Sequence, residues 1–292
     1  MEKPVPKFLP YLALVCGILA LSLSSFFIRW SEAPGTVTSF FRMTVASLAL
    51  LPFYVRLSNK KRFPGKCLLW LPVLGGLFVA LDHATWSTAL GLTTIATATL
   101  LNNIAPLWVG LFSLLIWRQG LHSRFWFGLG LTLIGATLIF GGDLVTNTHF
   151  TGGNVLGLIS SFFYGGYYLV TQRARSRFST LAYIWPVICS AAIFLLTINL
   201  VMQKSLTGYP PLTYLAFLGA GLISQIIGYF SVGFALGHLP AALVAPTMII
   251  QPVLTSFMAI PLAHEPLRPA QWLGGAIVLT GIYLVNQTSG QG

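Results

Sequence analysis

The chain has 292 residues, of which 55% are hydrophobic and only 7% are charged, and its formal net charge is +11. Soluble domains contain roughly 25% charged residues. This chain therefore lacks the polar surface that a soluble globule needs, and a membrane protein is the default class. A membrane-spanning helix takes about 20 apolar residues plus a short turn, which leaves room for about ten spans.

Continuous apolar stretches follow one another along the whole chain, without the alternation of apolar and polar residues that marks a membrane β-strand. This pattern favours a bundle of helices over a β-barrel. In chain order the predicted transmembrane helices cover residues 9–28, 36–56, 68–88, 94–117, 124–141, 152–171, 181–201, 212–235, 240–263 and 269–287. The predicted fold class is an all-α polytopic membrane protein with ten transmembrane helices.

The basic residues are distributed unevenly between the two sides of this predicted bundle. With the N-terminus in the cytoplasm, the inner segments hold Lys3, Lys7, Arg56, Lys60, Lys61, Arg62, Lys66, Arg118, Arg124, Arg173, Arg175 and Arg177. The outer segments hold Arg29, Lys204 and Arg268, together with the acids Glu32, Asp143 and Glu265. Because cytoplasmic loops carry an excess of Lys and Arg, we expect a multi-pass membrane protein with both termini in the cytoplasm. The basicity needs no nucleic-acid partner to explain it.

Motifs for catalysis, cofactor binding and metal binding are absent from the sequence. It contains no P-loop, no HExxH pair and no cluster of His, Cys or acidic residues at metal-ligand spacing. Cys16, Cys67 and Cys189 have neither metal spacing nor the arrangement of a disulfide framework. We expect no enzymatic activity, no cofactor and no metal. The first apolar stretch is interpreted as a retained helix and not as a cleaved signal peptide.

The two halves of the chain align with each other at a shift of 146 residues. The segment "ALGLTTIATATLLNNIAPL" from Ala89 lies on "ALGHLPAALVAPTMIIQPV" from Ala235. Glycines, prolines and tryptophans match in this register, and shared apolar composition does not explain such matches. The pairs are Gly91 with Gly237, Pro106 with Pro252, Trp126 with Trp272, Gly128 with Gly274, and Gly135 with Gly281. The sequence therefore predicts two repeats, residues 1–146 and residues 147–292.

Each predicted repeat holds five spans, which is an odd number, so the second repeat enters the membrane from the side opposite to the first. The charges agree, because the loop with Arg118 and Arg124 is inside while its counterpart with Glu265 and Arg268 is outside. Inverted repeats recur in secondary transporters, which hold their substrate near the membrane midplane between the repeats. We therefore expect a transporter.

Several segments resemble the EamA family of the drug/metabolite transporter superfamily. They are "FFRMTVASLALLPF" from Phe40, "ATWSTALGLTTIATATLLNNIAPLWVGLFSLL" from Ala84, and "AALVAPTMIIQPVLTSFMAIPLAHEPLRPAQWLGGAIVLTGIYLV" from Ala241. The resemblance covers essentially the whole chain, and the sequence is similar to those of bacterial amino-acid and metabolite exporters. It implies export of a small organic metabolite across the bacterial inner membrane. The family usually carries a glutamate after the fourth and ninth spans, which Glu265 supplies once, whereas the first repeat has Gln119.

Prolines at matching positions interrupt the fourth and ninth spans. A proline inside a helix removes a hydrogen bond and kinks the helix, and matched interruptions are a pointer to a transporter's binding site. The kink residues are Pro106 and Pro252, and the polar residues beside them are Asn102, Asn103, Thr247 and Gln251. We expect these residues to line the site. The alternatives are that the prolines only shape the bundle and that the amides bond neighbouring helices.

Asp82 and Arg42 lie within spans at similar depth. Arg42 is about six residues into the second span, and Asp82 is about six residues from the end of the third, roughly 9 Å from the outer end. Opposite charges on antiparallel neighbours pair and relieve the cost of burying both. We therefore expect a structural ion pair. A proton-carrying role for Asp82 and a direct contact with substrate are the alternatives.

His83 is the candidate proton carrier, because histidine titrates near neutral pH. Its counterpart in the second repeat is Tyr229, one turn beyond Gln225. Trp86 follows one turn after Asp82 and is either part of the interfacial aromatic belt or a cover over a cavity. We expect His83, Trp86, Gln225 and Tyr229 to contact substrate, while ordinary packing within the bundle stays the alternative for each.

Small hydroxyl groups and aromatic rings interleave in the sixth span and in its counterpart, the first span. The sixth span reads "SSFFYGGYYLV", with Tyr164, Tyr167 and Tyr168, and the first reads "LSLSSFFIRW", with Ser22, Ser24 and Ser25. Such a mixture suits a cavity for an amphipathic organic molecule. We expect Tyr164 and Tyr168 to contact substrate, with packing as the alternative.

The sequence as a whole predicts a secondary transporter that exports small organic metabolites by alternating access. Its expected partners are a small-molecule substrate, such as an aromatic or other bulky neutral amino acid, and the lipid bilayer. A proton-coupled exporter of cationic drugs is the alternative within transport. A lipid scramblase or a non-transporting membrane partner is the alternative of another class. The oligomeric state stays open between monomer and dimer.

Overall fold

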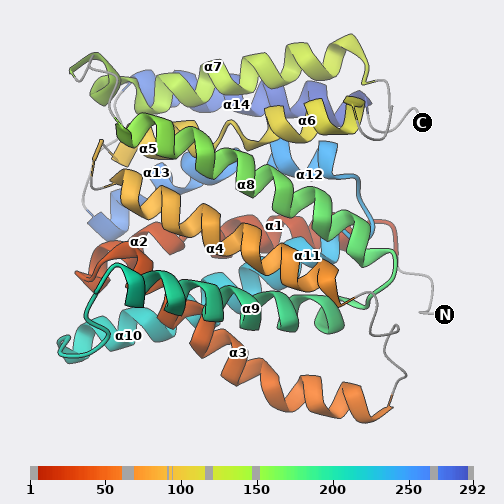
Figure 1. The fold of residues 1–292 in the computed structure, drawn as a ribbon. Helices are drawn as coiled ribbons and strands as arrows, with labels where there is room; N and C mark the ends of the chain where they lie inside the picture. The colour runs from red at the N-terminus through yellow and green to blue at the C-terminus, as the bar shows by residue number, and fades with distance from the viewer. Residues whose placement is uncertain are drawn as a thin grey trace. The chain divides into compact units, whose positions relative to one another are not determined.

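The computed structural model describes residues 6–60, 69–90, 92–93, 95–115, 121–146, 152–263 and 269–288. Within these ranges the chain is helical apart from short turns and connections (Figure 1). The α-helices are α1 (Leu9–Ser22), α2 (Ser24–Ser31), α3 (Gly35–Lys60), α4 (Trp70–Leu90), α5 (Ile95–Asn102), α6 (Ala105–Leu115), α7 (Ser123–Thr146), α8 (Gly152–Arg175), α9 (Thr180–Val201), α10 (Pro211–Gly219), α11 (Phe230–Ala235), α12 (Ala241–Thr247), α13 (Ile250–Ala263) and α14 (Pro269–Thr288). A π-helix, η2 (Ala220–Tyr229), joins α10 to α11. The predicted all-α class is confirmed.

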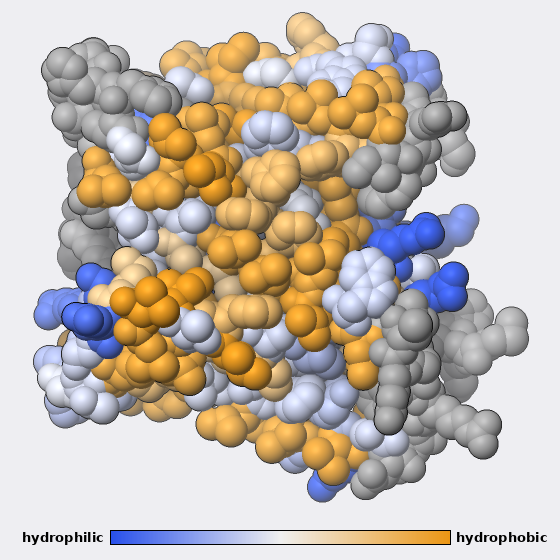
Figure 2. All heavy atoms as spheres, viewed as in Figure 1, coloured by the Kyte–Doolittle hydropathy of each residue, from blue (hydrophilic) through white to orange (hydrophobic). Residues whose placement is uncertain are grey.

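Four of the described helical stretches are long and apolar enough to cross a membrane: Leu9–Ile28, Gly35–Ser58, Thr180–Val201 and Pro211–Ala235. Shorter apolar helices cover Ala105–Leu115, Ser123–Ile139 and Ala241–Thr255. Many large apolar side chains are exposed on these helices, as at Leu48, Ile193 and Val201. Figure 2 shows such apolar side chains spread over the face in view. An apolar exterior of this kind suits contact with lipid and not with water.

The chain forms two compact units that differ from the two halves of the sequence. Unit 1 comprises Met1–Ala84 and Leu169–Pro240, and unit 2 comprises Thr85–Tyr168 and Ala241–Gly292. Each unit therefore takes segments from both halves. Helices α4 and α8 run from one unit into the other.

Helices α3 and α9 pack against each other in unit 1 in opposite directions. Near the start of α3, the carbonyl oxygen of Thr36 accepts a 3.0 Å hydrogen bond from Asn199 Nδ2, close to the end of α9. Further along α3, the carbonyl of Ser47 accepts a 3.0 Å bond from Trp185 Nε1, close to the start of α9. A shift of 146 residues carries α3 onto α9, so these are repeat-equivalent helices that pack antiparallel.

Glycines let α1 approach η2 and α11 in the same unit. A Cβ atom at Gly17 would lie 2.8 Å from the Val232 side chain, and one at Gly228 would lie 2.7 Å from the Leu21 side chain. Both distances are shorter than a Cβ contact allows. Ser224 fixes the contact further, because its hydroxyl donates to the carbonyl oxygen of Ala20 at 3.1 Å.

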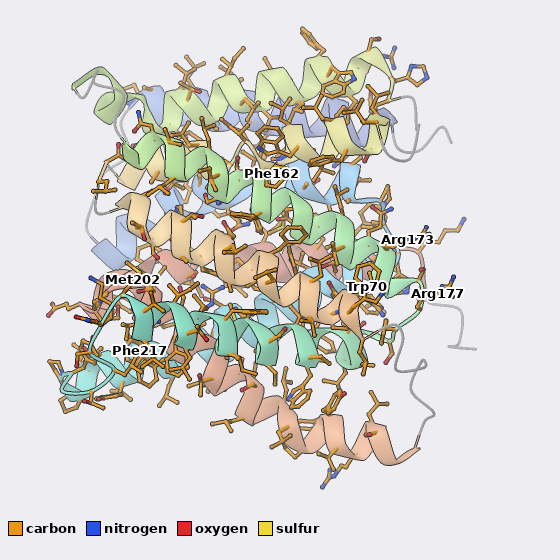
Figure 3. All side chains as sticks on the ribbon, viewed as in Figure 1. Trp70, Phe162, Arg173, Arg177, Met202 and Phe217 are labelled. Carbon is orange, nitrogen blue, oxygen red and sulfur yellow. The ribbon has the colours of Figure 1, made fainter. Side chains whose placement is uncertain are left out.

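Two of the basic residues that the sequence assigns to the cytoplasmic side lie at one end of unit 1. Figure 3 shows Arg173 and Arg177 at the end where α4 begins with Trp70, while Met202 and Phe217 lie at the opposite end. Both arginines are exposed. These residues belong to the set that the sequence assigns to the cytoplasmic side.

Helices α7 and α14 also pack antiparallel, and they meet through four glycines of unit 2. A Cβ at Gly128 would lie 2.8 Å from the Gly281 carbonyl oxygen, and one at Gly281 would lie 2.6 Å from the Gly128 carbonyl oxygen. Gly135 and Gly274 oppose each other in the same way, at 2.7 Å in both directions. Gly274 and Gly281 are the repeat equivalents of Gly128 and Gly135. The contact is therefore reciprocal, as it is across a two-fold axis.

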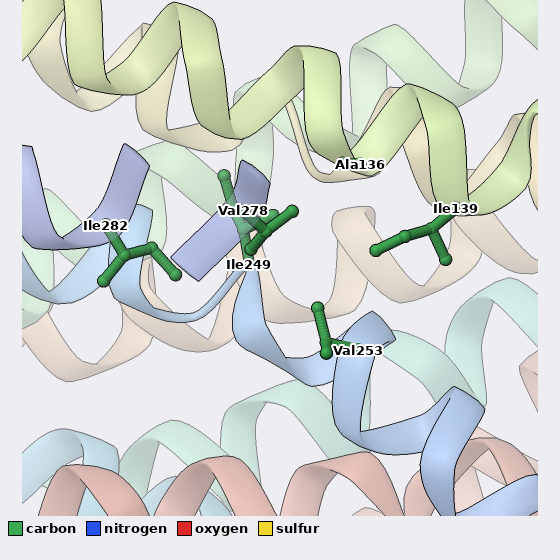
Figure 4. Close-up of a cluster of buried hydrophobic side chains, with 6 residues drawn as sticks. All are labelled: Ala136, Ile139, Ile249, Val253, Val278 and Ile282. Atoms are coloured by element: carbon green, nitrogen blue, oxygen red, sulfur yellow. The ribbon is translucent and has the colours of Figure 1, made fainter. Parts of the chain in front are cut away.

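The apolar core of unit 2 is built beside these glycines. It contains Ala136 and Ile139 of α7, Ile249 and Val253 at the junction of α12 and α13, and Val278 and Ile282 of α14 (Figure 4). Each of these side chains is at most 6% exposed. The core thus holds the break between α12 and α13 against the α7–α14 pair.

Candidate functional site

A group of polar side chains is buried in unit 1, among helices that are otherwise apolar. We name it the polar cluster, and it consists of Ser24 of α2, Ser39 and Arg42 of α3, His83 of α4, and Gln225 and Tyr229 of η2. Except for the partly buried Ser24, these side chains are at most 6% exposed. Ionisable groups are rarely buried in this way within a membrane, and they mark binding sites or transport pathways by default.

Arg42 is held by contacts from two further elements. Its Nε donates to Gln225 Oε1 at 2.8 Å, and its Nη1 donates to Ser24 Oγ at 2.9 Å. Its Cζ lies 5.4 Å from the centroid of the Tyr229 ring, within the range of a cation–π interaction. The guanidinium therefore fastens α3 to both α2 and η2.

The close approach of η2 to α3 depends on Gly221. A Cβ there would lie 2.6 Å from the Val45 side chain and 3.1 Å from the carbonyl oxygen of Arg42. Any larger residue would push η2 away from α3. Gly221 is one of the sequence features that bring Gln225 within reach of Arg42.

His83 lies between two hydroxyl groups. Its Nε2 is 3.3 Å from the hydroxyl oxygen of Tyr229, and its Nδ1 is 3.5 Å from Ser39 Oγ. Each hydroxyl can donate or accept, so either neutral tautomer of the imidazole is accommodated. His83 thus connects α4 to η2 and α3.

Asp82 precedes His83 and is 6% exposed. Both Asp82 and Arg42 take part in further interactions besides those given above. The predicted ion pair between the two stays a prediction. The bonds of Arg42 to Gln225 and Ser24 were not anticipated from the sequence, because residues 183 and 18 positions away are involved. Ser39 was missed too, although it lies one turn before Arg42 on the same helix.

Asn102 and Asn103 lie in unit 2 and use their amide groups differently. Asn102 Nδ2 donates to Ser160 Oγ at 2.9 Å and so joins α5 to α8. Asn103 Nδ2, just after the end of α5, donates to the carbonyl oxygen of Thr99 in the last turn of that helix at 2.8 Å. Trp108 Nε1 adds a 2.8 Å bond to Ser161 Oγ, between α6 and α8. The bonds of Asn102 and Trp108 to α8 correspond to the alternative in which polar groups bond neighbouring helices. The substrate contacts expected of Asn102 and Asn103 stay predictions.

The kinks expected at Pro106 and Pro252 take the form of complete breaks. The chain leaves the helix at a turn at Asn103–Ile104, between α5 and α6, and at a turn at Met248–Ile249, between α12 and α13. Each proline lies in the first turn of the helix that follows, where its missing N–H has no helical partner to lose. The breaks overlap when the sequence is shifted by 146 residues.

The remaining predicted residues also lie in unit 2. Thr247 Oγ1 donates to the carbonyl oxygen of Leu243 at 2.7 Å and lies 3.4 Å from Asn286 Oδ1, while the partly buried Gln251 is engaged by neighbouring groups. The rings of Tyr164 and Tyr168 lie 4.6 Å apart between centroids. Trp86 follows the polar cluster along α4, and its buried Nε1 has no hydrogen-bond partner among the described residues.

Several residues named from the sequence lie outside the described residues, or have side chains that do. They are Lys3, Ser25, Arg29, Lys60, Lys61, Arg62, Lys66, Cys67, Arg118, Gln119, Asp143, Glu265 and Arg268. Within the described ranges, Cys16 and Cys189 are free thiols. No group of three or more His, Cys, Asp or Glu side chains suited to a metal ion occurs in the same ranges.

The fold matches that of a solved structure, "Crystal structure of protein". The two superpose with a TM-score of 0.81, covering 97% of this chain and 98% of that one, at 17% sequence identity. At this identity the likeness establishes the fold alone.

Curated relatives are named as transporters and not as enzymes. An "Uncharacterized transporter" of Methanothermobacter thermautotrophicus is 28% identical, and the match covers 68% of this chain and 58% of that protein. "Uncharacterized transporter YdfC" of Bacillus subtilis is 23% identical over 83% of this chain and 78% of its own. A "Probable terminal-alkyne amino-acid exporter" of Streptantibioticus cattleyicolor is 25% identical over 84% of this chain and 82% of its own.

A family model described as the EamA-like transporter family matches the chain twice, over residues 8–141 and 151–287. The two matches together cover nearly all of the sequence, one in each half. With the helical fold and the buried polar cluster, they establish that the chain belongs to the EamA-like transporter family and is a membrane transporter.

Proposed function

We propose that the protein exports small organic metabolites across the bacterial inner membrane as a secondary transporter, and that its substrates are amino acids with aromatic or other bulky neutral side chains. The observation that carries this proposal is the polar cluster of unit 1. It gathers a guanidinium, an imidazole and a carboxamide from three helical elements into a place with almost no exposure, and the buried carboxyl group of Asp82 belongs to the residue before His83. Such groups are costly inside a membrane unless they serve binding or transport.

The chemistry of the cluster, together with Asp82, suits a zwitterion. Arg42 offers a positive charge and Asp82 an acidic group, so one ligand with a carboxylate and an ammonium group finds a complement for both. The Tyr229 ring, which faces the Arg42 guanidinium at 5.4 Å, adds an aromatic surface. A cationic drug would gain from Asp82 and be repelled by Arg42, so the cluster favours an amino acid over a cation.

Alternating access between inverted repeats is the mechanism that we infer. The antiparallel packing of the repeat-equivalent helices α3 and α9, and of α7 and α14, supports it. The matched helix breaks before Pro106 and Pro252 support it further, because interrupted helices in corresponding positions accompany substrate sites in secondary transporters. With five spans in each repeat and basic residues on the inner side, both termini would lie in the cytoplasm.

The export direction and the substrate class draw support from one relative. The protein of Streptantibioticus cattleyicolor is named as an exporter of terminal-alkyne amino acids, and it is 25% identical over 84% of this chain. A related substrate, carrying the same amino-acid head group with a different bulky side chain, fits the polar cluster.

The test is uptake into proteoliposomes that contain the purified full-length protein. Labelled phenylalanine, leucine, a nucleoside and a cationic dye would each be offered with and without a pH gradient, and liposomes without protein serve as the control. We expect saturable uptake of the amino acids alone. Dye uptake that requires the gradient would replace the proposal with a proton-coupled exporter of cations. Lipid movement without uptake of any solute would indicate a scramblase.

A further inference from the structure

The side-chain carboxamide of Gln225 is fully buried, and its oxygen and its nitrogen differ in their hydrogen bonding. Its side chain is 0% exposed, and its Oε1 accepts the 2.8 Å bond from Arg42 Nε. Its Nε2, also buried, has no hydrogen-bond partner anywhere in the described part of the chain. The two N–H groups of this nitrogen therefore have no acceptor among the described residues.

The orientation of this amide follows from its neighbour. A guanidinium has only donors, so the amide group that faces Arg42 Nε must be the oxygen, and the nitrogen must face away. The positive charge at the oxygen also polarises the amide, which strengthens its N–H groups as donors. The result is a pair of oriented donors on an amide that is bonded to a guanidinium, which suits an acceptor that carries negative charge.

The backbone at Gln225 is unusual in a second, independent way. Residues Ala220–Tyr229 form a π-helix of ten residues, and π-helical segments in proteins occur frequently at functional sites. The segment brings Gly221 against the backbone of Arg42 and places both Gln225 and Tyr229 beside its guanidinium. The rare helical form thus coincides with the contacts that orient the amide.

Buried donors are almost always satisfied in native proteins, and the exceptions call for a ligand or another specific cause. From these observations we propose that the Gln225 carboxamide recognises the carboxylate of the transported molecule, and that Arg42 is the positioning residue that turns the Gln225 donors toward it. This inference rests on the proposed function and names the chemical group of the substrate that the protein recognises, which is the carboxylate. An amine or an amide with the same side chain offers no anionic acceptor and is discriminated against.

The test compares molecules that differ only in this group. Competition against labelled phenylalanine uptake would be measured in proteoliposomes with phenylalanine, phenylalaninamide, phenethylamine and 3-phenylpropionate. For the wild-type protein we expect phenylalaninamide and phenethylamine to compete at least about tenfold more weakly than phenylalanine, which is the range for loss of a charged hydrogen bond. Because 3-phenylpropionate has a carboxylate and no ammonium group, it distinguishes a general organic acid from an amino acid.

The informative variant is Gln225→Glu. A glutamate still accepts from Arg42 Nε but has no N–H groups and repels a carboxylate, so we expect the preference for phenylalanine over phenylalaninamide to fall about tenfold or more. Ser224→Ala is the matched control, since Ser224 is the adjacent, fully buried residue of η2 and bonds only α1 in the contacts described. It should keep the wild-type preference.

The outcomes separate the two proposals. If wild-type protein takes up phenylalanine and Gln225→Glu keeps the wild-type preference, the role of Gln225 is wrong while the proposed function stands. Equal competition by phenylalaninamide and phenylalanine in the wild type would also overturn the inference. If no amino acid is taken up by wild-type protein, the proposed function fails and the inference fails with it. Gln225→Met, of similar size and without donors, provides the same comparison if the glutamate variant is not monodisperse in size-exclusion chromatography.

Discussion

The Nε2 atom of His83 lies 3.3 Å from the hydroxyl oxygen of Tyr229, and the two residues are 146 positions apart, the offset that superposes the two halves of the sequence. A residue and its own repeat equivalent meet only close to the axis that relates the repeats. This contact is therefore what the proposed inverted repeat requires of unit 1. The reciprocal glycine pairs between α7 and α14 meet the same requirement in unit 2.

Replacing Tyr229 by Phe removes the hydroxyl beside His83 and keeps the ring beside Arg42. We expect a loss of about 1 kcal/mol in the free energy of unfolding, the usual value for one hydrogen bond. Tyr229→Leu removes the ring as well and should cost about 0.5–2 kcal/mol more, through the lost cation–π interaction. The melting temperatures of both variants in the same detergent check this order of stability. Equal melting temperatures for the two would contradict a role for the ring.

The predicted pairing of Arg42 with Asp82 can be measured by a double-mutant cycle. Arg42→Ala leaves Gln225 and Ser24 without the guanidinium, and removing one partner of a buried ion pair costs about 3–5 kcal/mol. If Asp82 is paired with Arg42, the double variant Arg42→Ala/Asp82→Asn should lose less free energy of unfolding than the two single variants lose in total. The expected difference is about 0.5–3 kcal/mol. The ion pair would be ruled out by strictly additive effects.

The α7–α14 contact offers a comparison between glycines of one helix. Gly128→Ala and Gly135→Ala put a methyl group 2.7–2.8 Å from an opposing carbonyl oxygen, so we expect each to destabilise the protein by about 1–3 kcal/mol. A Cβ at Gly130 of the same helix would meet no described heavy atom within 4 Å. Gly130→Ala should therefore be neutral or slightly stabilising. Melting temperatures of the three variants test this, and a Gly130 variant as unstable as the others would contradict the role of close packing between α7 and α14.

Pro106→Ala and Pro252→Ala restore a backbone N–H to the first turn of α6 and of α13. We expect both variants to fold, because an alanine fits a helix start, and to transport more slowly, because the new donors favour continuing the helix across the breaks at Asn103–Ile104 and Met248–Ile249. The initial rate of amino-acid uptake at saturating substrate is the measurement. Pro186 lies inside α9, away from both breaks, and Pro186→Ala is the control that should leave the rate unchanged.

Much of the helical architecture follows from apolar stretches alone. The predicted spans 36–56 and 181–201 correspond to α3 and α9 without interruption. The stretch 9–28, by contrast, is divided at Leu23 into α1 and α2, and 212–235 contains the π-helix η2. No proline lies at either place. Both features depend on how the segment packs against its neighbours. Hydropathy measures the environment of a segment and not the details of its backbone.

The sequence indicates most residues of the candidate site, but it does not indicate which of them contact each other. A charge or an amide in an apolar stretch is visible in the sequence, which is how Arg42, Asp82, His83 and Gln225 were found. The partner of each depends on tertiary packing, so the bond from Arg42 to Gln225 could not be derived from spacing. Ser39 escaped notice for a related reason, since a serine in a membrane helix more often bonds its own backbone than another side chain.

The composition of unit 1 from both halves has a consequence for how the protein is made. Arg42 is synthesised 183 residues before Gln225, which at about 5–20 residues per second means a delay of roughly ten to forty seconds. During that interval the guanidinium on α3 lacks the Gln225 acceptor on η2, although its other acceptor, Ser24, has already been synthesised. Until η2 is made, lipid head groups, water or the insertion machinery would have to take the place of Gln225. Biogenesis is thus the stage at which this arginine is most exposed to the bilayer.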